Sequence, residues 1–197
     1  MTYGEADSYQ GAPQVGYQRP NVDESARYAA QHGGEEHSSM FSSVLSSVLD
    51  RDDDDHKRPV EEHDAHQAYE AHDRIYNQGG ASEASSRDMG SAAALQAFKM
   101  FSSKGSGGSG GGSSELIGLA MGEAMKLYKG SSGGGSSGGS QAEMLQSAAA
   151  MAMKLYASQS GGQSGGGSSG LSTIMGLLGK SGGSGGGGAA SLISKLL

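Results

Sequence analysis

Apolar side chains recur along this sequence at helical spacing, in short segments separated by polar or glycine-rich stretches. In residues 40–49 they fall on one side of a helix, and serines occupy the other side. A second amphipathic segment runs from Pro59 to about Asn77. No segment alternates apolar and polar residues over the length of a strand. The pattern predicts an all-α fold, in which short amphipathic helices form a small helical bundle behind a disordered N-terminal tail.

The second half of the chain contains an internal repeat. Lys99, Lys126 and Lys154 each follow an Ala-x-x-x-Ala pair and precede an aromatic residue by two positions. A helix of about 14 residues is marginal alone in water, so each copy needs a helical partner in this chain or in another molecule. Small residues at this spacing let another helix approach closely. The predicted contact stripe comprises Ala93, Ala97, Phe98, Phe101, Ala120, Ala124, Met125, Tyr128, Ala148, Ala152, Met153 and Tyr156.

Glycine and serine divide the chain into regions, since they make up 36 and 34 of the 197 residues. We expect a disordered Tyr/Gly/Gln tail at 1–22, an acidic helical region with the first repeat helix at 23–104, and Gly/Ser-linked helical repeats at 105–197. A flexible linker of about 12 residues spans roughly 20 Å, which is about the length of one 14-residue helix. Parallel and antiparallel packing of the repeat helices therefore both remain open.

Charge is distributed unevenly along the chain. Of the 21 acidic residues, 18 lie in residues 1–88 beside 7 of the 14 basic ones, so this part carries −11 and the remainder carries +4. The two parts should attract each other, in cis or in trans. The repeat lysines are spread one per segment, so we expect no nucleic-acid partner. The start of the chain resembles no signal sequence and no stretch is long and apolar enough for a membrane helix, so we expect a cytoplasmic location.

Candidate chemistry is sparse. The absence of cysteine excludes disulfides, cysteine-based zinc sites and a cysteine nucleophile. The best metal candidate is His63 and His66, which share one helical face with Glu70, but a solvated helix places its polar residues in the same way. We therefore expect no bound metal and no cofactor. Paired carboxylates occur only in exposed acidic runs, where nothing separates their pKa values, so we expect no enzyme.

Several short features follow one another along the chain: a Tyr/Gly-rich tail, Ala29-Ala30-Gln31-His32, Met40-Phe41-Ser42-Ser43, an acidic stretch, His66-Gln67-Ala68-Tyr69, the segment from Ala94 to Phe101, and Ala152-Met153-Lys154-Leu155-Tyr156. This order resembles that of the small fungal proteins called beta-flanking proteins, which carry a domain of unknown function. The resemblance implies a fungal source and an intracellular setting, and it brings no activity, cofactor or catalytic residue.

These observations together predict a non-enzymatic helical interaction or assembly protein, which binds itself or another helical protein through the repeat stripes. Two alternatives stay open. One is a peripheral protein on a membrane or lipid surface, although each helix carries only about one lysine on its polar side. The other is a mostly disordered, stress-associated protectant, which low helicity in plain buffer would indicate.

Overall fold

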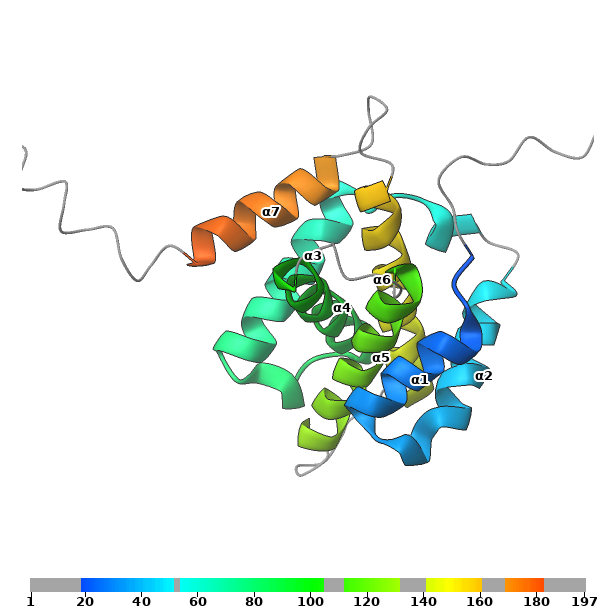
Figure 1. The fold of residues 1–197 in the computed structure, drawn as a ribbon. Helices are drawn as coiled ribbons and strands as arrows, with labels where there is room; N and C mark the ends of the chain where they lie inside the picture. Colours follow the sequence, from blue (N-terminus) through cyan, green and yellow to red (C-terminus); the bar gives the residue numbers. More distant parts are fainter. Residues whose placement is uncertain (1–18, 52–53, 105–111, 132–140, 161–168, 183–197) are drawn as a thin grey trace, which may run out of the picture.

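The computed structural model describes residues 19–51, 54–104, 112–131, 141–160 and 169–182 (Figure 1). These residues contain seven α-helices and no strand, which confirms the predicted all-α fold. Most of the predicted tail and the last apolar segment, residues 192–197, lie outside the described residues. The helices are α1 (Val22–Gly33), α2 (Ser38–Leu49), α3 (Glu62–His72), α4 (Ser86–Ser103), α5 (Gly112–Ser131), α6 (Gln141–Ser160) and α7 (Ser169–Gly182).

Short helical turns complete the described chain. A 3₁₀ turn, η1 (Glu35–His37), joins α1 to α2, and another, η2 (Asp54–Lys57), precedes α3. The segment predicted from Pro59 begins as a helix only at Glu62, and it ends in a π-helical turn, η3 (Asp73–Asn77). A last 3₁₀ turn, η4 (Gly80–Ser82), leads to α4.

The three repeat helices, α4, α5 and α6, pack against one another in the centre of the molecule. Helices α1 and α2 cover one side of this group, and α3 and α7 lie on the other (Figure 1). One hydrophobic core runs through both the acidic region and the Gly/Ser-linked region. The boundary near residue 104 is therefore a change in composition and not in packing. The largest fully buried side chains include Phe41, Leu45, Leu95, Leu116, Ile117, Met121, Met125, Met144, Leu145 and Leu155.

Glycines bring the central helices close to their neighbours. Gly118 and Gly122 of α5 face the backbone of α1, so the partner of this strip is α1 and not another repeat helix. Gly90 of α4 lies against the backbone of α6. An added Cβ at any of these positions would meet backbone atoms at 3.0 Å or less. Small residues are thus required where helix axes cross at short distance.

The opposite charges of the two parts of the chain meet within the molecule. Lys129 of α5 donates to the carbonyl oxygen of Gly33, at the end of α1, and to the carboxylate of Glu36, both at 2.9 Å. Lys154 of α6 pairs with two aspartates of the acidic region. These contacts tie α1 and α3 to the repeat helices, in addition to the apolar core.

Candidate functional site

The predicted contact stripe lies inside the chain. Nine of its twelve residues are buried. The remaining three, Phe101, Tyr128 and Tyr156, are half-buried and pack against the same core. The contacts of the stripe are therefore intramolecular, and a partner protein would have to bind a surface that the repeat does not define.

The predicted metal candidates lie on the solvent-exposed side of α3. His63, His66 and Glu70 are all exposed. The acid recorded near His63 is its chain neighbour Asp64, with Nδ1 and Oδ1 3.8 Å apart. Within the part of the chain that the structure describes, no three His, Cys, Asp or Glu side chains gather closely enough to hold a metal ion.

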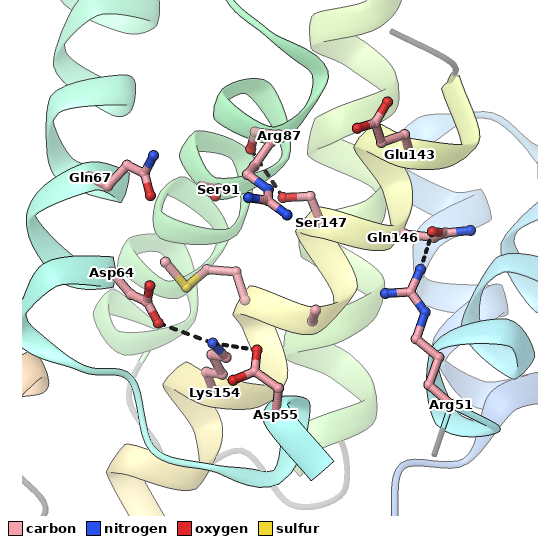
Figure 2. Close-up of a pocket in the computed structure, with 12 residues that line it drawn as sticks. Arg51, Asp55, Asp64, Gln67, Arg87, Ser91, Glu143, Gln146, Ser147 and Lys154 are labelled. Carbon is pink, nitrogen blue, oxygen red and sulfur yellow. Dashed lines mark hydrogen bonds and ion pairs between the residues drawn. The ribbon is translucent and has the colours of Figure 1, made fainter. Parts of the chain in front are cut away.

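A groove of about 430 Å³ lies between the end of α2, η2, α3, α4 and α6 (Figure 2). One face of α6 forms its floor, from Glu143 to Lys154. Helices α3 and α4 form one wall, and Arg51, which follows α2, and Asp55 of η2 line the other side. Its lining is mostly polar and charged: Arg51, Asp55, Asp64, Gln67, Arg87, Ser91, Glu143, Gln146, Ser147, Ala150, Met151 and Lys154.

Lys154 closes one end of this groove through two ion pairs. Its Nζ lies 2.8 Å from Asp55 Oδ2 and 3.0 Å from Asp64 Oδ2, and its side chain is only 13% exposed. Burial alone would lower the pKa of Lys154, but the hydrogen bonds and charges of the two aspartates outweigh it and raise that pKa. The hydrogen bond from Lys154 in turn lowers the pKa of Asp55. Lys154 therefore stays an ammonium, and its charge is balanced within the protein.

Two arginines occupy the rest of the groove. The guanidinium of Arg51 donates to the side-chain carbonyl oxygen of Gln146. The Arg87 side chain extends over the floor near Ser147, whose hydroxyl donates to the Arg87 carbonyl oxygen at 3.0 Å (Figure 2). Among the described residues, no carboxylate forms an ion pair with either guanidinium in the groove. A guanidinium has five N–H donors, so both arginines keep donors for a bound group.

The position of Arg87 follows from the packing of α4 on α6. Gly90 is the contact point, where a Cβ would lie 2.5 Å from the carbonyl oxygen of Met144 and 2.7 Å from Cβ of Ser147. Arg87 and Ser91 lie three residues before and one residue after this glycine. Because the two helices touch there, both residues line the groove.

Replacing Lys154 with Met should destabilise the fold by about 1–2 kcal/mol, since Asp55 and Asp64 then lose the cation that balances them. The loss should shrink below about pH 4. The folded-state pKa of Asp55 is lowered. The stability that its ion pair with Lys154 contributes is therefore fully present above the unfolded-state pKa of about 3.9, and it disappears as the pH falls through the folded-state pKa. Urea unfolding at pH 7 and pH 3 measures both effects. The exposed Lys99→Met is the control and should change stability by less than about 0.5 kcal/mol at either pH; equal losses in the two variants would contradict the assignment.

A second polar cluster joins η3 to α4 and α5. His72 Nε2 lies 2.8 Å from Gln96 Oε1, and the His72 ring stacks on Tyr76 at 4.8 Å between centroids. The Tyr76 hydroxyl donates to Glu123 Oε1 at 3.3 Å. Burial lowers the pKa of His72 and raises that of Tyr76, so both rings are neutral near pH 7. The hydrogen bonds of both rings join different helical elements, so this cluster stabilises the packing of these elements.

The sequence pattern did not reveal Arg51 or Arg87. One signal was present: Glu143, Ser147 and Lys154 fall on one face of α6 at helical spacing and form a polar line there. This line indicates that one face of the helix is not fully covered. The two arginines lie outside any periodic segment, and only the packing of α2 and α4 on α6 brings them to this line.

Comparison with protein families gives one match. The family is described as a domain of unknown function (DUF7721), and the similarity covers residues 21–106, from α1 to α4. No curated protein and no solved structure matches the chain. The expected relationship to a domain of unknown function is thus found, while the match does not name the beta-flanking proteins. Helices α5 and α6, which complete the core, lie beyond it. In the described parts of the chain, every helix is too short or too polar to cross a membrane.

Proposed function

We propose that the protein is a non-enzymatic helical interaction or assembly protein, which binds a second copy or another protein through the groove on α6. The single observation that carries this proposal is that Arg51 and Arg87, from separate elements, meet in one open polar groove with donors to spare. Two of the polar groups that could do chemistry there are already engaged. Lys154 is held as an ammonium by two carboxylates, and the Ser147 hydroxyl donates to a backbone carbonyl.

Sedimentation of the full chain tests this proposal, both as purified protein and in a native lysate. We expect a species heavier than the 19.8 kDa monomer in at least one of the two samples. The double variant Arg51→Gln/Arg87→Gln should shift this species toward the monomer mass. Arg27→Gln/Arg74→Gln, which changes two exposed arginines that do not line the groove, should leave it unchanged. A monomer in both samples of the wild type would refute the proposal.

The finer predictions from the sequence remain proposals. They are a relationship to the fungal beta-flanking proteins, a cytoplasmic location, and partners that are themselves helical. The alternative roles, at a lipid surface or as a stress-associated protectant, predict flotation with anionic liposomes and low helicity in plain buffer, respectively. Two of the lysines that a lipid surface would need, Lys129 and Lys154, are paired with carboxylates in the fold.

A further inference from the structure

We infer that the groove binds an extended segment of a partner protein whose side chains carry oxyanions, with Arg51 and Arg87 as the receiving groups. This inference rests on the proposed function and specifies its ligand. The groove combines an open polar lining with two guanidiniums that form no ion pair with a carboxylate of the described residues.

The dimensions and lining of the groove suit a peptide. The floor from Glu143 to Lys154 covers about three turns of α6, or about 16 Å at 1.5 Å per residue. An extended peptide rises about 3.3 Å per residue, so about five residues span this length. Gln67 and Ser91 stand along one wall and can bond to peptide amides and carbonyls. Pockets for small apolar ligands have mostly apolar linings, and this groove does not.

The distribution of charge indicates where the oxyanion would bind. At one end, Asp55 and Asp64 neutralise Lys154. At the other end, the described lining residues with a charge are Arg51, Arg87 and Glu143, whose formal charges sum to +1 (Figure 2). The planar guanidinium fork matches carboxylate and phosphate oxygens, and such charge-assisted hydrogen bonds are about twice as strong as neutral ones.

Asp55 already shows this mode of binding within the chain. It belongs to the acidic run Asp52–Asp55, it is 63% exposed, and its carboxylate reaches into the groove to pair with Lys154 at 2.8 Å. The groove thus holds a partly exposed carboxylate against one of its cations. A partner segment with acidic or phosphorylated side chains would pair with Arg87 and Arg51 in the same way.

Fluorescence anisotropy with the full chain tests this inference. The probes are fluorescein-labelled hexapeptides that carry two glutamates or two phosphoserines, and matched peptides that carry glutamine or serine. At least one oxyanion peptide should bind ten-fold or more tightly than its neutral match, and salt should weaken that binding. The glutamate and phosphoserine arms distinguish the two sources of the oxyanion. Equal binding of charged and neutral peptides, or no binding at 1 mM, the highest concentration of the assay, would overturn the inference.

Variants locate the binding. Arg51→Gln and Arg87→Gln should each weaken the binding of the oxyanion peptide about ten-fold. Arg87→Lys keeps the positive charge without the planar guanidinium, so it should weaken that binding less. The exposed Arg27→Gln should have no effect. Circular dichroism confirms that each variant is folded, as expected for changes at exposed positions.

If no peptide binds but the heavy species of the sedimentation experiment still depends on the arginines, the ligand class is wrong and the proposed function stands. If that species is absent as well, both are wrong.

Discussion

A chain truncated after residue 106, which retains the whole region of family similarity, is expected to lose its cooperative fold. Helix α1 packs mainly on α5, and α4 packs on both α5 and α6. The truncation removes fully buried side chains such as Leu116, Met121 and Leu155. Each loss of this kind costs about 2–5 kcal/mol, so a few of them exceed the usual 5–15 kcal/mol stability of a domain. Circular dichroism and urea unfolding should show low helicity and no cooperative transition.

A chain truncated after Ser160 is the matched control. It lacks residues 161–197, of which the structure describes only α7, and among the described side chains of α7 only that of Ile174 is fully buried. Helix α7 packs mainly on α3. This chain should keep a cooperative transition, with a loss of about 2–3 kcal/mol or less. Native-like helicity and cooperative unfolding of the 106-residue chain would show that α1 to α4 form a core of their own, in contradiction to the packing described here.

Gly118→Ala and Gly90→Ala should each destabilise the fold by about 3 kcal/mol, although alanine favours a helix over glycine by about 1 kcal/mol. At Gly118 the new Cβ would lie 2.6 Å from the carbonyl oxygen of Ser25 and nearer still to Cβ of Tyr28. At Gly90 it would lie 2.5 Å from the carbonyl oxygen of Met144. Backbone atoms cannot turn aside as the tip of a flexible side chain can, so two helices must separate. The shift of the urea midpoint measures each loss.

Gly130→Ala provides the comparison for this pair. Gly130 also lies in α5, but a Cβ there has nothing within 4 Å. The substitution should leave stability unchanged or raise it by up to about 1 kcal/mol. A similar loss at Gly118 and Gly130 would mean that helix propensity, and not the approach of α1, decides the outcome. Gly90→Ala should also weaken the binding of oxyanion peptides to the groove, because it moves Arg87 away from the groove floor.

The groove shows how much of a site can arise from packing alone. Of the groove, only Lys154 was identified from the sequence, as a repeat lysine; the spacing of Glu143, Ser147 and Lys154 also made the floor predictable. Its walls were not, since Arg51 follows the end of α2 and Arg87 lies in the first turn of α4. The predicted metal candidates show the converse: His63 and His66 had suitable spacing, but α3 turns them to solvent and no third ligand approaches in the described chain.

The sequence by itself determined which segments are helical and which side of each is apolar. Helical hydrogen bonds join residues four apart and side chains repeat every 3.6 residues, so this information is local. The repeat was therefore found, and each of its Ala pairs is buried. The π-helical turn at Asp73–Asn77 was missed, because its apolar spacing continues that of α3.

Only the tertiary structure decided which helices are partners. Gly/Ser linkers reach either end of the next helix and barely restrict the choice, since loop-closure entropy varies slowly with length. An Ala–Gly strip accepts any helix that comes close, and α1 rather than a repeat helix covers Gly118 and Gly122. That arrangement buries the contact stripes within one chain, and the groove with Arg51 and Arg87 is the surface that we propose for a partner.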